Sequence, residues 1–206
     1  KIGNYVVKIV PDYTVPINNL LKIAVPLCDK NRCMTWTQYY DWCLSASPSI
    51  DPSVAEHGLR TVASFGWFYT YVRDGAVWDI KVPSRWEDAL PSCPYLGAKN
   101  FIFRGKEINA ADMGNIMYGY TGRATGFGKI TLFWGGGVAA QGSINNAAVS
   151  TPPYYGDRPE DHVKIEEGFN LFNSDYPQYP SVGYDGIPIE EGILAEVADK
   201  LIDYVG

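Results

Sequence analysis

The stretch that decides the fold is residues 109–127, NAADMGNIMYGYTGRATGF. Asn109 is a good helix N-cap, and Asp112 then falls in the first helical turn, where a carboxylate interacts favourably with the helix dipole. Gly114, Gly119 and Gly122 inside the helix would each cost up to about 1 kcal/mol relative to alanine. The sequence therefore predicts a helix from Asn109 that either packs closely against another backbone or a ligand, or breaks near Gly119.

Working outward, apolar spacing and N-cap signals predict further helices at 16–27, 34–44 and 52–72, one that Asp157 caps, and a last one from Pro188 to about Tyr204. Residues 76–82 and 100–104 have the pattern of short strands, joined by a loop over 84–97. The run Gly135–Gly137 and the residues up to about 155 have loop composition. We expect an α+β fold that is predominantly helical, with a small sheet or hairpin near residues 76–105.

Length and composition favour one soluble globular domain over residues 1–206. The chain has 206 residues, of which 46% are hydrophobic and 19% charged, which argues against disorder. No apolar run approaches the roughly 20 residues that span a bilayer. The net charge of −6 is unlike that of nucleic-acid-binding domains, which usually carry a basic face. We therefore expect neither a nucleic acid nor a membrane as partner.

Four cysteines, at positions 28, 33, 43 and 93, have no CxxC spacing. Their even number favours two disulfides and an extracellular protein over four buried free thiols. Spacing does not choose among the three possible pairings of Cys28, Cys33, Cys43 and Cys93.

Carboxylates are the main acid–base resource of the chain. His57 falls inside a predicted helix and His162 near the exposed start of another, and neither accompanies a nucleophile motif, a phosphate-binding loop or metal-ligand spacing. We therefore expect no metal and no cofactor. The candidate acids are Asp79, in an otherwise apolar segment, with Asp112 and Glu107 at the start of the central helix. Asp157, Glu160 and Asp161 have the pattern of helix-capping residues.

Three blocks in one order resemble the polymorphic toxin type 44 domain of bacteria. The first is 68–81, ending in GAVWDIK, the second is 112–127 with Gly137 and Gln141 after it, and the third runs from Asp157 to Gly168. The resemblance covers about 65–172. The sequence departs from that domain at Met117, where the toxin block often has His, so no imidazole is carried over to that position.

The chain also resembles the fungal muramidases of glycoside hydrolase family 184. That resemblance implies a secreted lysozyme that cleaves the β-1,4 bond between N-acetylmuramic acid and N-acetylglucosamine in bacterial peptidoglycan. The wall-binding module that often accompanies such domains has no counterpart in this sequence, so we expect the catalytic domain alone, acting as a monomer.

Glycoside hydrolysis generally uses two carboxyl groups, one of which stays protonated. Among the matched blocks we expect Asp79, beside Trp78, to be the general acid and Asp112 the nucleophile or base, with Glu107 as substitute for either. The expected substrate-binding residues are the remaining polar and aromatic side chains of these blocks: Trp78, Lys81, Asn115, Tyr118, Tyr120, Arg123, Trp134 and Gln141.

Two other classes of function remain open from the sequence. A toxin-type nuclease that needs no metal would use Arg and Lys side chains for phosphate binding, against the acidic net charge. A non-catalytic peptidoglycan- or carbohydrate-binding module would use the Tyr and Trp side chains and would not depend on the carboxylates.

Overall fold

The structure is a computed structural model, and it describes residues 10–32, 64–143 and 145–179. The elements follow one another as α1 (Thr14–Lys30), α4 (Pro83–Ala89), β1 (Phe101–Phe103), β2 (Lys106–Ile108), α5 (Ala110–Ala124), α6 (Lys129–Gln141), the 3-10 turn η1 (Ala147–Ser150) and α7 (Pro159–Asp175). Residues 64–72 are helical as well. The fold is mainly helical with one small sheet, which confirms the predicted class. The predicted helices at 34–44 and from Pro188, and residues 52–63 of a third, lie outside the described residues.

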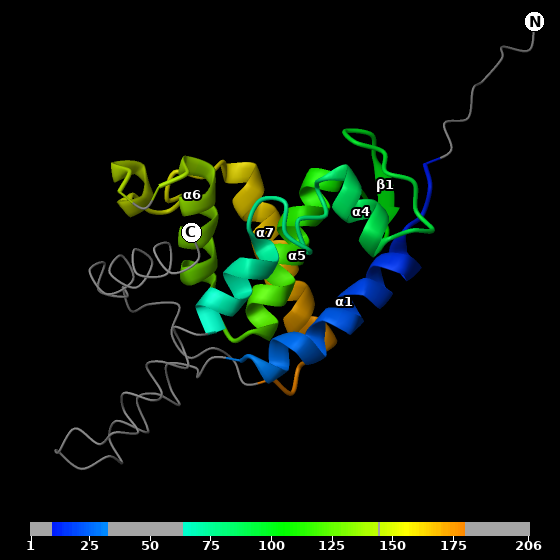
Figure 1. Ribbon diagram of the computed structural model, residues 1–206, viewed down its shortest axis with the longest axis horizontal. Coiled ribbons are helices and arrows are strands. Elements are labelled where there is room, and N and C mark those ends of the chain that lie inside the picture. Colours follow the sequence, from blue (N-terminus) through cyan, green and yellow to red (C-terminus); the bar gives the residue numbers. More distant parts are fainter. Residues whose placement is uncertain (1–9, 33–63, 144, 180–206) are drawn as a thin grey trace, which may run out of the picture.

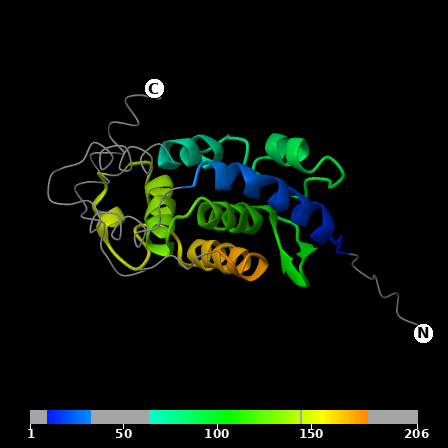
Figure 2. The same cartoon turned by 90° about the horizontal axis from the view of Figure 1, so that it is seen from below.

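Helix α5 is the central element, with α1 on one side and α7 on the other (Figure 1; Figure 2). A Cβ added at Gly119 would collide with the backbone carbonyl of Ile165 in α7, and one at Gly168 with that of Ile116 in α5. These glycines let the two helix backbones approach closely. The close approach predicted for the central helix is thus confirmed, and the alternative of a break near Gly119 is wrong.

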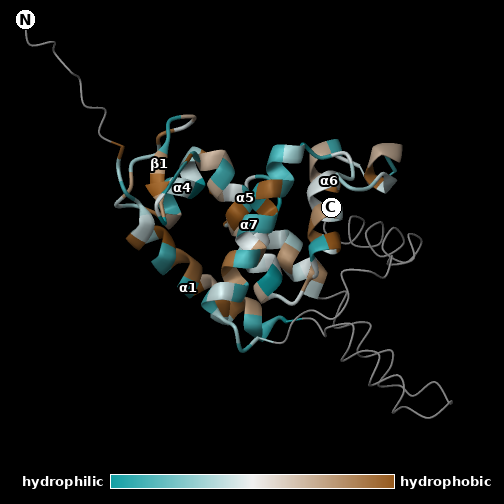
Figure 3. Cartoon of the chain, turned by 180° about the vertical axis from the view of Figure 1, so that it is seen from behind, coloured by the Kyte–Doolittle hydropathy of each residue, from teal (hydrophilic) through white to brown (hydrophobic). Residues whose placement is uncertain are grey.

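Local sequence explains where these helices begin. The Asn109 side chain accepts the backbone N–H of Asp112, and the Asp112 carboxylate accepts that of Asn109, a reciprocal capping box that starts α5. Helix α1 confirms the helix predicted at 16–27. It buries one apolar face, formed by Ile17, Leu21, Ala24, Val25 and Cys28. Brown apolar and teal polar segments alternate along it in Figure 3, as expected of a half-buried helix.

The sheet is a two-stranded antiparallel hairpin in which Phe101 pairs with Ile108. Its two turn residues, Arg104 and Gly105, have φ angles of 47° and 78°, the left-handed pair that suits the twist of a tight hairpin. Strand β1 confirms the strand predicted at 100–104. The strand predicted at 76–82 is wrong, because those residues form turns.

The turns at 76–82 have a local cause. The Asp79 carboxylate accepts the backbone N–H of Gly75 at 2.8 Å, and Gly75 itself has a φ of 70°. Pro83 then takes the first position of α4, so part of the predicted loop at 84–97 is helical. Trp86 anchors this short helix, because its buried indole N–H donates to the carbonyl of Cys93 at 2.7 Å.

Two further predictions are corrected near the end of the described chain. Gly135–Gly137 lie inside α6 and are not a loop, since Gly137 packs on the backbone of Tyr155 and Gly135 lies beneath the Tyr118 hydroxyl. The close packing offsets their low helix propensity. The N-cap of α7 is Arg158 and not Asp157, because Pro159 takes the first helical position.

Cys28 and Cys93 are buried free thiols, so neither forms one of the expected disulfides. Both sulfurs lie in the hydrophobic core, and burial raises the pKa of the Cys28 thiol to about 12. Cys33 and Cys43 lie outside the described residues. Among the helices that the structure describes, none has the length and apolar character needed to cross a membrane.

Candidate functional site

The three sequence blocks converge on the first half of α5. Lys81, from the first block, packs on Gly114. The Cβ of Lys81 lies 3.4 Å from the position that a Cβ added to Gly114 would take. From the third block, Asp161 accepts a hydrogen bond of 2.8 Å from the Asn115 amide. One turn further along α5, the Tyr118 hydroxyl donates to the carbonyl of Leu132 in α6 at 3.1 Å. We call the polar side chains gathered here the α5 cluster; its members are Asp79, Lys81, Asn115, Tyr118, Asp157, Asp161 and His162.

Asp79 is a buried carboxylate at one edge of the α5 cluster. Its side chain is 3% exposed, and its Oδ1 lies 3.7 Å from Nζ of Lys81, which also lies 3.6 Å from Asp74. The Asp79 carboxylate thus has two polar neighbours, the backbone N–H of Gly75 and the Lys81 ammonium. Trp78 is buried beside it, with its ring packed against Trp67 and Tyr71.

The other two predicted acids have local structural roles. Asp112 is a member of the capping box of α5, as described above. Glu107 is exposed on β2, where it accepts a hydrogen bond of 3.0 Å from the Asn100 amide. The contacts of these two carboxylates therefore lie within the α5 cap and the hairpin region, and their catalytic assignment stays a prediction.

Asp157 and Asp161 form a second carboxyl pair that the sequence analysis placed among capping residues. The Asp161 carboxylate accepts two hydrogen bonds from the Arg158 guanidinium, at 2.7 and 3.0 Å, besides the one from Asn115. The Asp157 side chain is 7% exposed, and its burial, with the nearby charge of Asp161, raises the pKa of Asp157. Two neighbouring carboxyls thus lie in different environments, one buried and the other held by three hydrogen bonds.

His162 lies beside Asp157, with its Nε2 3.9 Å from the Asp157 Oδ2. The sequence analysis expected this histidine to be exposed, which is wrong, since its side chain is 7% exposed. The imidazole stacks on Phe133 of α6 with ring centroids 4.3 Å apart, and burial lowers the pKa of His162. The fold brings the start of α7 beneath α6, and no local pattern around His162 indicates that packing. The sequence signal that could have indicated this site is a spacing: Asp161 follows Asp157 by about one helical turn, and His162 is the next residue.

The remaining predicted binding residues divide into two groups. Tyr120 and Arg123 are each 1% exposed, and they donate to Asp175 at 3.1 Å and to Asn173 at 2.7 Å. These contacts pack α5 against α7, and the expected role of Tyr120 and Arg123 in substrate binding stays a prediction. Trp134 is half-buried near Phe65, and Gln141 donates to the carbonyl of Gly156, which ties the end of α6 to the chain before α7.

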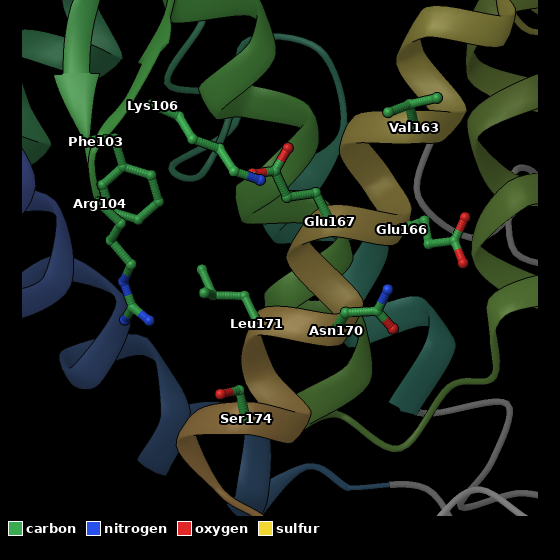
Figure 4. Close-up of a pocket in the computed structure, with 9 residues that line it drawn as sticks. All are labelled: Phe103, Arg104, Lys106, Val163, Glu166, Glu167, Asn170, Leu171 and Ser174. Atoms are coloured by element: carbon green, nitrogen blue, oxygen red, sulfur yellow. The ribbon is translucent and has the colours of Figure 1, made fainter.

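An open groove of about 550 Å³ lies elsewhere, between the hairpin and α7 (Figure 4). Its charged side chains are paired, as in the 2.6 Å contact between Lys106 and Glu167. The groove holds none of the predicted catalytic side chains. Within the described residues, no group of three or more His, Cys, Asp or Glu side chains is arranged to hold a metal ion.

The α5 cluster has the chemistry of an acid–base site, in a mainly helical α+β domain. A family model described as bacterial toxin 44 matches residues 67–174, more than half of the 206-residue chain. The chain belongs to this family, and the match spans all the members of the α5 cluster. No curated protein and no solved structure matches the chain. The toxin resemblance predicted from the three blocks is thus confirmed.

Proposed function

We propose that the chain is a toxin-type hydrolase that cleaves the glycan strands of bacterial peptidoglycan, between N-acetylmuramic acid and N-acetylglucosamine. The observation that carries the proposal is the pair Asp157 and Asp161. One carboxyl has its pKa raised by burial, and the other accepts three hydrogen bonds from Arg158 and Asn115. Glycosidases need one protonated and one ionised carboxyl at the scissile bond.

In this mechanism Asp157 gives its proton to the glycosidic oxygen as the bond from that oxygen to C1 breaks. The Asp161 anion then faces the positive charge that develops at C1, or takes the proton from the attacking water. Either route uses one carboxyl protonated and the other ionised, and burial raises the pKa of Asp157, the proposed acid. Asp79, 3.7 Å from Lys81, is an alternative partner for Asp157. This role differs from that of general acid, which the sequence predicts for Asp79 and which stays a prediction.

The charge and the aromatic side chains around the α5 cluster support a glycan over a polyphosphate. Among the described residues, carboxylates outnumber cations here: Lys81 and Arg158 pair with the acids at 74, 79, 160 and 161, and Asp157 lies beside His162. Such a surface repels the phosphates of RNA. Tyr154, 43% exposed, has its ring against His162, 5.4 Å between centroids, and gives a sugar ring an aromatic face to stack on.

A toxin-type nuclease is a second candidate, because His162 beside Asp157 is a pair that also suits general base catalysis on RNA. Assays of peptidoglycan cleavage and RNA cleavage on one preparation of the full chain distinguish the two candidate functions. We expect soluble reducing ends to be released from purified peptidoglycan while a structured RNA stays intact, with and without EDTA. Degradation of the RNA without any release from peptidoglycan would favour the nuclease and contradict the proposal.

A further inference from the structure

His162 is a buried histidine that takes no part in the proposed mechanism. Among the described residues, its Nε2 has no hydrogen-bond partner, although both this side chain and that of Asp157 are 7% exposed. A buried polar nitrogen without a partner is costly, so its retention calls for an explanation. The nearest titratable group is the Asp157 carboxyl, whose Oδ2 is 3.9 Å away.

The surroundings fix the direction of the imidazole. Phe133 stacks on one face of the ring, with planes 21° apart, and Tyr154 packs edge-on with planes 70° apart. The nitrogen that faces Asp157 is Nε2, 3.9 Å from Oδ2. The pair therefore approaches through Nε2 and Oδ2 alone.

The elements packed around Asp157 and His162 contribute the following charged, polar and aromatic groups. The segment that leads into α7, and α7 itself, supply Asp161 and the exposed Arg158. Helix α5 supplies the Tyr118 hydroxyl, and α6 supplies the Phe133 ring and Gly136, where an added Cβ would lie 3.0 Å from Oδ2 of Asp157.

We infer that His162 is a positioning residue that shares a single proton with Asp157, so that the pair binds this proton as one unit. In one form Asp157 carries the proton and faces the neutral imidazole; in the other, the imidazolium faces the carboxylate. The catalytic meaning rests on the proposed function, where the shared proton keeps Asp157 ready to protonate the leaving oxygen. Burial raises the pKa of Asp157 and lowers that of His162, which brings the two values towards each other.

The test is an NMR titration of the full chain with labelled histidine. The chain has two histidines, so the spectrum of His57→Gln assigns the His162 signal. We expect Asp157→Asn to lower the His162 midpoint by about one pH unit, because the carboxylate charge favours the imidazolium. The control, Glu160→Gln, removes an exposed carboxylate beside Arg158 and should leave the midpoint unchanged. An identical midpoint in Asp157→Asn and the wild type would overturn the inference.

Two further readouts keep the inference testable. If Asp157→Asn does not fold, the Asp157 carboxyl carbon of the wild type is followed, and it should titrate with the same midpoints as His162; independent midpoints would overturn the inference. In His162→Gln the alkaline limb of the pH–rate profile should move to lower pH, and an unmoved limb counts against the inference. Absence of any glycan cleavage by the wild type would refute the proposed function alone, since the titration does not depend on activity.

Discussion

At the scale of single residues, the fold separates acids that the sequence groups together. Asp112 completes a capping box, whereas Asp157, four residues before Asp161, lies buried beneath α6. Close packing of α6 on Asp157 explains part of this difference in burial. Gly136 of α6 lies so near that a Cβ added to it would be 3.0 Å from the Asp157 carboxyl. Packing by a helix distant in sequence thus turns a residue with a capping pattern into the proposed acid.

Replacing Asp157 by Asn should lower the rate of glycan cleavage by at least about 100-fold, since Asn cannot donate a proton to the leaving oxygen. In the wild type, activity should fall as the pH rises through the raised pKa of Asp157, because the neutral form is the active one. The rate against pH is measured with soluble glycan fragments for both proteins. Glu160→Gln is the matched control, and an equal loss in that variant would argue against a special role of Asp157.

At the scale of elements, the sequence predicted helices that carry local signals better than elements that depend on contacts with distant residues. Asn109 and the N-terminal half of α1 carry local signals, which is why both helices were predicted. The helical state of Gly135–Gly137 depends on Tyr118 and Tyr155, which lie far from these glycines along the sequence. The turns at 76–82 depend on a side-chain hydrogen bond that apolar alternation does not reveal.

The same reasoning applies to the site. The sequence identified Asp79, Lys81, Asn115 and Tyr118, all members of the α5 cluster, because they fall in the blocks that resemble the toxin domain. Asp157, Asp161 and His162 were assigned other roles, since their burial is set by α6 and not by their own helix. Burial between elements is what sequence periodicity describes least well.

The contact of α5 with α7 gives a stability prediction. Gly119→Ala should lower the free energy of unfolding by at least about 2 kcal/mol, because the new Cβ collides with the backbone carbonyl of Ile165. Gly114→Ala is the control in the same helix: its Cβ would meet Lys81 at an ordinary 3.4 Å, and the better helix propensity should raise stability by up to about 1 kcal/mol. Urea unfolding measures both, and equal effects would contradict the packing.

At the scale of the whole molecule, Arg104 joins the hairpin to two helices. Its guanidinium donates to both carboxylate oxygens of Asp175 in α7, at 2.9 and 2.7 Å, and its Nε donates to Asn18 of α1. Tyr120 of the central helix donates to the same carboxylate. This connection forms at the left-handed turn residue of the hairpin, so one side chain fixes the hairpin against both α1 and α7.

Asp175→Asn should therefore destabilise the fold by about 1–2 kcal/mol at neutral pH. The Arg104 guanidinium lowers the pKa of Asp175 below its ordinary 3.8, so the carboxylate contributes stability above about pH 3.8 and loses it as the pH falls through the lowered value. Thermal unfolding, measured as the pH is lowered below 4, should show a smaller loss of stability for Asp175→Asn than for the wild type. Asp88→Asn, which removes an exposed partner of Arg85, should change neither quantity, and a comparable loss there would refute the proposed contribution.

The most direct test of the proposed function is mass spectrometry of the soluble fragments that the chain releases from purified peptidoglycan, after borohydride reduction. We predict fragments that end in reduced N-acetylmuramic acid, equally abundant with the wild type and Glu160→Gln and at least about 100-fold less abundant with Asp157→Asn. The absence of soluble fragments with the wild type, or the release of stem peptides alone, would contradict cleavage of the glycan.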